Sequence, residues 1–328
     1  MNLVTGASGF IGSAVVRRLL ARGQKVRCYV EPGAKLDNLA GLDVDIVTGD
    51  VNDREGIARA LDGCDTLFHL AAIYAIWLRD PSLMYRVNVE GSKTVLWAAY
   101  KAKLERVVYT SSIAAVGRGR DGAPVDETHE FSQQDWDDGN AYIRSKWLSE
   151  KDALRFAAEG LPLVVVNPAF PFGERDIGPT PTGGFIVGAL QKQVPGYIDS
   201  GFCAIDVDDC AEGHVLAAEK GRVGERYILG NHNIMLREFY RIVARVSAMK
   251  IPERRIPTVV AESMGWLMEK VADVRKRPPL ATFKATRYAA HTHFFDNSKA
   301  KRELGLPSTP LDVTIEKAVR WFRTHGYA

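Results

Sequence analysis

Met1-Asn-Leu-Val-Thr-Gly-Ala-Ser-Gly-Phe-Ile-Gly12 opens the chain and decides its fold. A short apolar run leads into three glycines with the spacing G-x-x-G-x-x-G, and a segment with helical periodicity follows. Gly6 permits a tight turn, Gly9 lets backbone N–H groups approach a pyrophosphate, and Gly12 lets the helix pack closely on the strand. The helix N-terminus then faces the anion. The stretch therefore predicts a strand, a turn and a helix that bind a nucleotide.

The first half of the chain alternates short apolar runs with segments of helical periodicity. We expect strands at residues 25–30, 43–48, 64–70, 106–111 and 163–166. We expect helices at residues 11–22, 54–61, 81–102 and 142–158. Strands that alternate with helices predict an α/β fold with a doubly wound parallel sheet.

The regular alternation weakens after Pro168. Residues 168–205 are rich in proline and glycine and predict long loops, and helices follow at 237–247, 259–273 and 310–324. We therefore divide the chain into a nucleotide-binding domain at 1–168 and a smaller, loop-rich, mainly helical substrate lobe at 169–328. Residues of about 203–232 are expected to return to the first domain. Ligands of such sheets bind at the carboxyl ends of the strands.

Composition and residue spacing argue against nucleic-acid binding, a metal site and a membrane span. The 328 residues carry a net charge of +3, which is too small to indicate nucleic-acid binding. The cysteines form no C-x-x-C pair and the histidines have no metal-ligand spacing, so we expect no metal. No apolar run approaches the length of a membrane span, and the chain begins with a strand instead of a signal peptide, so we expect a cytoplasmic protein. The basic stretch Arg275-Lys-Arg277 is either a solvated helix end or a membrane contact.

Two further stretches suggest catalytic chemistry. Val107-Val-Tyr-Thr-Ser-Ser112 is an expected strand that ends in two hydroxyls, and Tyr142-Ile-Arg-Ser-Lys146 places a phenol and an ammonium on one helical face. A neighbouring ammonium favours the phenolate and would lower the pKa of Tyr142. Ser112 could then hydrogen-bond a substrate oxygen, although Ser111 is the alternative. A Tyr-x-x-x-Lys pair alone also occurs on ordinary surface helices.

Together these motifs resemble the extended short-chain dehydrogenase/reductases, also called the NAD-dependent epimerase/dehydratase family, with a Rossmann fold. The resemblance rests on Thr5–Gly12, Gly49-Asp50, His69-Leu-Ala-Ala72, Asn88-Val-Glu-Gly91, Tyr109-Thr-Ser-Ser112, Tyr142–Lys146, Val207-Asp-Asp209 and Ser298–Gly305. Within the family the chain looks most like the hopanoid-associated sugar epimerases and the dihydroflavonol-reductase-like branch.

The resemblance implies a role for each matching residue. Tyr142 is the expected proton donor or acceptor, Lys146 holds the cofactor ribose, and Ser112 positions the substrate oxygen. The expected cofactor contacts are Gly6, Ser8, Gly9, Phe10, Ile11, Gly12, Glu31, Asp50, Val51, Ala71, Ala72, Tyr142, Lys146 and Pro168. Asn88 either braces the catalytic helix or caps a helix. Family members often dimerise through that helix, so we expect a homodimer, with Trp97 and Trp147 suited to its interface or to the core.

Cofactor choice depends on Glu31. It follows the second expected strand, nineteen residues after Gly12, where an acidic residue accepts hydrogen bonds from the adenosine ribose of NAD. Relatives in this branch more often carry an arginine there, which pairs with the 2′-phosphate of NADP. We therefore predict NAD, while NADP stays possible through Lys35.

Residues that are expected near the substrate bear on the reaction. Ile113, Ala114 and Ala115 replace the acidic residues of family dehydratases, and Phe202 stands where sugar-nucleotide epimerases carry an arginine. Apolar residues also gather in the segments that are expected to surround the substrate: Ile73, Tyr74, Ile76, Trp77, Phe170, Phe172, Phe185 and Phe202. Of these, Ile73, Trp77, Phe170 and Phe202 are predicted substrate contacts together with Ser112, although they could equally be core.

Three functions fit these observations. The first hypothesis is a reductase or dehydrogenase of a small, hydrophobic substrate. The others are a sugar epimerase, for which Arg175 or Lys192 could hold a diphosphate, and a regulator that has lost catalysis.

Overall fold

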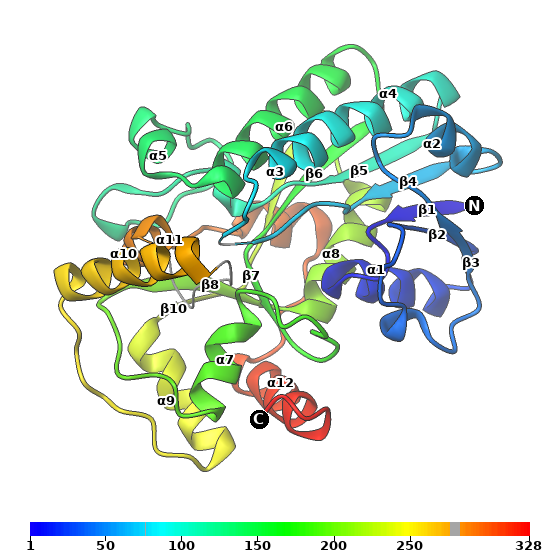
Figure 1. The fold of residues 1–328 in the computed structure, drawn as a ribbon. Helices are drawn as coiled ribbons and strands as arrows, with labels where there is room; N and C mark the ends of the chain where they lie inside the picture. Colours follow the sequence, from blue (N-terminus) through cyan, green and yellow to red (C-terminus); the bar gives the residue numbers. More distant parts are fainter. Residues whose placement is uncertain (76, 276–282) are drawn as a thin grey trace.

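The computed structural model describes residues 1–75, 77–275 and 283–328. Seven parallel strands form the main sheet in the order β3-β2-β1-β4-β5-β6-β9 (Figure 1). They are β1 (Asn2–Thr5), β2 (Val26–Val30), β3 (Asp45–Thr48), β4 (Thr66–His69), β5 (Arg106–Thr110), β6 (Leu163–Pro168) and β9 (Arg226–Leu229). The order reverses between β1 and β4, which is the switch point of a doubly wound Rossmann sheet and confirms the predicted fold class.

Helices cover both faces of this sheet (Figure 1). One face carries α1 (Phe10–Ala21) and α8 (Val207–Lys220), and the other carries α2 (Arg54–Leu61), α4 (Ser92–Ala102) and α6 (Ala141–Ala158). Successive strand residues point to opposite faces, so Val4 and Val108 join one core while Leu3 and Val107 join the other. Because both faces of the inner strands are buried, β1, β2, β4, β5 and β6 are rich in apolar residues, whereas the edge strand β3 is largely exposed.

The segment predicted as one helix at 81–102 is helical but not uniform. It consists of α3 (Ser82–Tyr85), a π-helical turn at Arg86–Gly91 and then α4. A π-helical turn inserts an extra residue into a helix and often marks a functional site. Here the turn contains Asn88, whose side chain is buried.

The region after Pro168 corrects one expectation. Residues 168–205 contain the expected long loops, at 173–182 and 191–200, but also three elements that we did not expect: β7 (Phe170–Phe172), α7 (Gly183–Leu190) and β8 (Gly201–Asp206). β7 and β8 join β10 (His232–Met235) in a second sheet of order β10-β8-β7. Short strands that pair across long stretches of chain leave little local signal. Farther along the chain, α8 lies on a face of the main sheet and β9 joins its edge, whereas β8 and β10 belong to the second sheet.

The remaining elements are helical. They are α5 (Gln133–Asp138), α9 (Leu236–Ser247), α10 (Thr258–Arg275), α11 (Phe283–Ala289), α12 (Leu311–Thr324), 3₁₀ turns at Asp37–Leu39, Ile113–Ala115 and Arg120–Gly122, and a π turn at Ala300–Leu304. α7, α9 and α12 pack with the second sheet around a third apolar core. Within the described ranges, no helix is both long enough and apolar enough to span a bilayer.

Candidate active site

The glycine turn lies between β1 and α1. Gly6 has φ +67°, and a Cβ there would lie 2.8 Å from the backbone of Ala71. A Cβ on Gly12 would lie 2.1 Å from the carbonyl oxygen of Gly6. Gly9, which is exposed, caps α1, so the free N–H groups of that helix face the open end of the sheet. The turn therefore has the shape that binds a pyrophosphate.

Buried polar residues fix the neighbouring strand end, which sequence reasoning did not single out. The Thr5 hydroxyl lies 2.7 Å from Nδ1 of His69 and accepts a hydrogen bond from the Ala71 N–H at 3.2 Å. Nε2 of His69 lies 3.0 Å from the Ser92 hydroxyl. Burial lowers the pKa of His69 to about 3, so the imidazole stays neutral. This network holds Ala71 and Ala72 beside the glycine turn.

The other predicted cofactor contacts lie along the same edge of the sheet. Glu31 directly follows β2 and is exposed, as is Asp50 beyond β3. Val51 is buried, and Pro168 ends β6. Around the glycine turn, Phe10 is buried while Ser8 and Ile11 are half-buried.

Hydrogen bonds of Asn38 join the glycine turn to the second lobe. The side-chain amide of Asn38 donates to the carbonyl of Ser8 at 3.2 Å and to the carbonyl of Arg175 at 3.1 Å. The Arg175 guanidinium pairs with Asp208 at 3.0 Å and with Glu174 at 3.5 Å. Arg175 is therefore neutralised by two carboxylates.

Tyr142 and Lys146 stand one turn apart on α6. The helix begins beside Asn140, whose side chain accepts a hydrogen bond from the Ile143 N–H at 3.1 Å. Lys146 is buried, and its ammonium donates to the carbonyl of Thr110 at 3.0 Å, at the carboxyl end of β5. The pair therefore lies at the same sheet edge as the glycine turn.

The pKa of Tyr142 is raised, whereas the sequence analysis expected it to be lowered. Burial raises its pKa, the nearby Tyr74 raises it further, and only a hydrogen bond with the Ser112 side chain opposes them. The prediction that Lys146 lowers this pKa is wrong for the protein alone, because burial dominates and Lys146 is not among the groups that act on Tyr142. Burial also lowers the pKa of Lys146 to about 8, against the attraction of Glu150. Tyr142 is therefore a phenol at neutral pH.

Ser112 is the better placed of the two serines. It lies beside Tyr142, and its hydroxyl accepts a hydrogen bond from the Ala114 N–H at 3.2 Å. Its carbonyl accepts from the Asn167 side chain at 2.9 Å. The Ser111 hydroxyl is buried and has no hydrogen-bond partner within the described part of the chain.

Asn88, in the π-helical turn, is hydrogen-bonded to α6 and to the segment after β4. Its amide nitrogen donates to the carbonyl of Ile73 and to the hydroxyl of Ser145, both at 3.0 Å. Its amide oxygen accepts from the Ile73 N–H at 2.7 Å. Ser145 lies between Tyr142 and Lys146 and donates to the Tyr142 carbonyl at 2.8 Å. This geometry favours the bracing interpretation over simple capping.

Aromatic side chains gather beyond Tyr142. The Tyr74 ring lies 4.8 Å from the Tyr142 ring, and its hydroxyl lies 3.2 Å from that of Thr182. Tyr288 on α11, which sequence reasoning missed, raises the pKa of Tyr142, and Tyr74 in turn raises the pKa of Tyr288. No local motif marks Tyr288, because α11 reaches the site only in the folded chain.

The predicted substrate residues separate into two groups. Ile73, Trp77 and Phe170 are half-buried, whereas Phe202 is only 5% exposed. The Phe202 ring lies within 6 Å of the rings of Phe170, Phe172, Phe185 and Phe239. Phe202 is therefore a core residue behind Phe170, and Ile76 lies outside the described residues.

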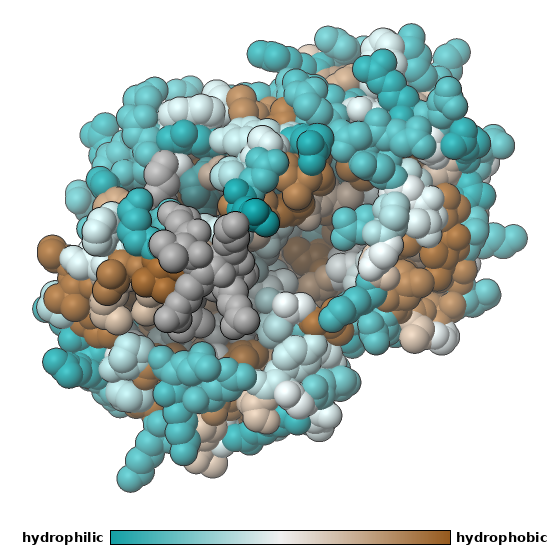
Figure 2. All heavy atoms as spheres, viewed as in Figure 1, coloured by the Kyte–Doolittle hydropathy of each residue, from teal (hydrophilic) through white to brown (hydrophobic). Residues whose placement is uncertain are grey.

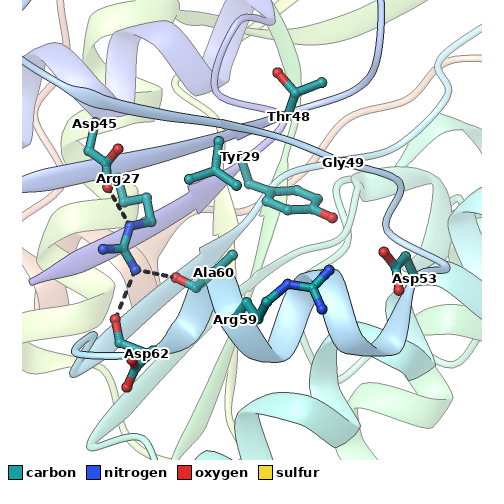
Figure 3. A pocket seen from close by; sticks show the side chains of 11 residues that line it. Arg27, Tyr29, Asp45, Thr48, Gly49, Asp53, Arg59, Ala60 and Asp62 are labelled. Carbon is teal, nitrogen blue, oxygen red and sulfur yellow. Dashed lines mark hydrogen bonds and ion pairs between the residues drawn. The ribbon is translucent and has the colours of Figure 1, made fainter.

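A separate hollow lies between β2, β3 and α2 (Figure 3). Arg27 spans it, bonded to the Asp45 carboxylate at 2.6 Å and to the carbonyls of Ala60 and Asp62 at 2.8 Å. None of the predicted catalytic residues lines this hollow. We interpret it as a polar surface depression.

The glycine turn lies at the switch point of the sheet, where dinucleotides bind in doubly wound folds, and Ser112, Tyr142 and Lys146 lie at the same edge. The sequence profile of the NAD dependent epimerase/dehydratase family matches residues 2–230, and the chain belongs to this family. It is therefore an NAD-dependent enzyme.

Individual relatives agree with this assignment. A Synechocystis sp. protein provisionally named dihydroflavonol 4-reductase is 39% identical, over 99% of this chain and 95% of its own. Sterol demethylase protein B of Methylococcus capsulatus is 31% identical, over 99% of both chains. A crystal structure titled gox2253 has a TM-score of 0.88 and 39% identity, covering 100% of this chain and 99% of its own.

Proposed function

We propose that this enzyme interconverts an alcohol and a carbonyl on a small, hydrophobic substrate, with Ser112, Tyr142 and Lys146 as its catalytic centre. The observation that carries the proposal is the position of Tyr142, next to Ser112 and one turn before a buried lysine, at the sheet edge that holds the glycine turn. A bound nicotinamide supplies or accepts the hydride.

The residues of the chain would then handle the proton. Because its pKa is raised, Tyr142 keeps its proton at neutral pH and can donate it to a carbonyl oxygen that becomes an alcohol. Ser112 would hold that oxygen. Lys146 has a pKa of about 8 and stays mostly charged at neutral pH, so it can bind the ribose hydroxyls and favour the developing phenolate.

Apolar surroundings support the choice of a hydrophobic substrate. The Tyr74 ring lies 4.8 Å from the Tyr142 ring, and Phe202, which the family resemblance aligns with the arginine that holds a sugar diphosphate, is buried among aromatic rings. Arg175, the nearest expected substitute, is engaged by Asp208 and Glu174. The relative named for sterol demethylation also suggests a lipophilic substrate, although that name describes the relative alone.

The cofactor site would prefer NAD over NADP. Glu31 is exposed directly after β2, where its carboxylate can accept the ribose hydroxyls and repel a 2′-phosphate. Lys35 is also exposed a short loop away and is the residue through which NADP could bind.

A homodimer through α4 and α6 fits the surface of these helices. Trp97 on α4 is exposed, with the Lys101 ammonium 4.4 Å from its ring centre, whereas Trp147 packs against Phe131 and Trp136. Trp97 is therefore the interface candidate and Trp147 a packing residue. Native mass spectrometry of the wild type and of Trp97→Lys tests this, since the variant should dissociate.

The reaction is tested by incubating the enzyme and reduced NAD with apolar ketones, and separately the enzyme and oxidised NAD with UDP-glucose. We expect the ketones to cause a net loss of the near-ultraviolet absorbance of the reduced nicotinamide. Isomerised sugar without net absorbance change would instead establish an epimerase. Cofactor binding without turnover of either substrate class would favour a regulator.

A further inference from the structure

The surface helix α10 exposes its apolar side. Its large apolar side chains with at least 42% exposure are Val259, Val260, Met264, Trp266, Leu267 and Val271, which we call the α10 stripe. Brown spheres mark this helix in Figure 2. Exposed apolar patches of this kind commonly mark interaction sites.

The stripe follows from the sequence pattern of the helix. Val260, Met264 and Val271 recur at helical spacing, so they share a face with Leu267. Small residues, Gly265 and Ala272, are buried instead, and α10 packs against α11. The large apolar side chains therefore have no partner among the described residues on their own side of the helix.

Charge distinguishes among possible partners. Residues 250–277 contain seven basic and four acidic residues, so this segment carries the same +3 as the entire chain. Arg254 and Arg255 precede the helix, Lys270 lies on it, and the sequence continues into the basic stretch Arg275-Lys-Arg277. Residues 276–277 lie outside the described residues, so they are counted only for their charge in the sequence.

Basic residues toward both ends favour an anionic surface over a second copy. In an antiparallel pair of α10 helices centred on the stripe, Arg254 of one copy would approach the Arg275 end of the other helix, and like charges repel. An anionic lipid surface would instead attract both ends, because each basic residue near such a surface strengthens binding. The apolar stripe between them matches a helix lying in the membrane interface.

The stripe is also close to the active site. α11, on which α10 packs, carries Tyr288, and this residue is an electrostatic neighbour of Tyr142 and Tyr74. Its ring stacks on His293 with 4.0 Å between centroids. One helix layer therefore separates the stripe from the catalytic tyrosine.

We propose that α10 docks the protein on an anionic bilayer surface, with the α10 stripe among the acyl chains and the exposed Arg254 and Lys270 at the headgroups. Docking there places the active site next to the bilayer. The proposal goes beyond the catalytic function and does not depend on it, because binding is measured without substrate.

The test is co-sedimentation of the full chain with vesicles of phosphatidylcholine alone or mixed with phosphatidylglycerol. We expect the wild type to bind the mixed vesicles and to be released by salt. Trp266→Gln with Leu267→Gln should weaken binding about tenfold or more, because burial of each such side chain contributes at least a factor of that order. The matched control is Val223→Gln, whose side chain is 50% exposed in a loop far along the chain from α10, and it should bind as the wild type does.

A second variant tests the charges separately. Arg254→Glu with Lys270→Glu keeps the stripe and should abolish the preference for anionic vesicles. Circular dichroism checks that each variant is folded. The proposal is overturned if the wild type does not sediment with mixed vesicles, or if the Trp266 and Leu267 variant binds equally well. It is also overturned if that variant only dissociates a dimer, which would make the stripe an interface between copies.

Discussion

Replacing Lys146 with methionine should make the protein more stable while removing its activity. Burial lowers the pKa of Lys146 from its ordinary value of 10.5 to about 8. One pKa unit corresponds to ~1.4 kcal/mol, so the proton on this buried lysine costs the folded state about 3 kcal/mol at neutral pH. Methionine removes this cost but leaves the Thr110 carbonyl without its donor, which loses about 1 kcal/mol. The net expected gain is about 2 kcal/mol.

The sign of the pH dependence follows from the lowered pKa. Below about pH 8 both the folded and the unfolded chain hold the proton, so the cost is fully present. Between about pH 8 and 10.5 the folded chain has released the proton that the unfolded chain still holds, and stability therefore rises with pH. The unfolding free energy of Lys146→Met should exceed that of the wild type by about 2 kcal/mol near pH 7 and by almost nothing near pH 10.

The assay is urea unfolding of the cofactor-free wild type and of Lys146→Met across this pH range. Burial raises the pKa of the Cys28 and Cys203 thiols to about 12, and their effect on stability runs in the opposite direction. Only the difference between the two proteins is therefore informative, since these contributions cancel in it. Lys151→Met, at an exposed position on the same helix, is the matched control and should change little. A Lys146→Met protein that is less stable than wild type near pH 7 would refute the reasoning.

Three further substitutions test the rest of the site. Gly12→Ala should cost about 1–3 kcal/mol of stability and weaken NAD binding in calorimetry, because its Cβ would meet the Gly6 carbonyl, whereas Gly184→Ala meets nothing and should be neutral. Asn88→Ala should lower the unfolding free energy by about 2 kcal/mol and reduce kcat more than NAD affinity, since three hydrogen bonds are lost; an unchanged kcat would contradict bracing. Glu31→Arg should tighten NADP binding and weaken NAD binding, and equal dissociation constants before and after would show that Glu31 faces away.

Local patterns predicted the main sheet well. The glycine turn and the apolar runs identify β1, β2, β4, β5 and β6 to within two residues, because a parallel strand buried on both faces is apolar throughout. The second sheet was missed, since β7 has three residues and pairs only with β8, far along the chain. Pro171 within β7 also argued for a loop.

The candidate active site could likewise be predicted from the sequence only in part. Tyr142, Lys146 and Ser112 could be placed from their motifs, because helical spacing and a strand end fix their positions. The direction of the Tyr142 pKa shift could not, because it depends first on the burial of the phenol and then on Tyr74, which comes from another segment of the chain. Phe202 looked like a pocket residue, but its aromatic neighbours become visible only after folding.

The most direct test of the catalytic centre is the Tyr142→Phe variant, in which only the hydroxyl is removed. NAD binding is measured by calorimetry, and turnover of an apolar ketone with reduced NAD by absorbance. We predict an unchanged dissociation constant for NAD and a loss of turnover of about 10²–10⁴-fold, the usual contribution of a general acid. Turnover close to that of the wild type would contradict the assignment of Tyr142 as the proton donor.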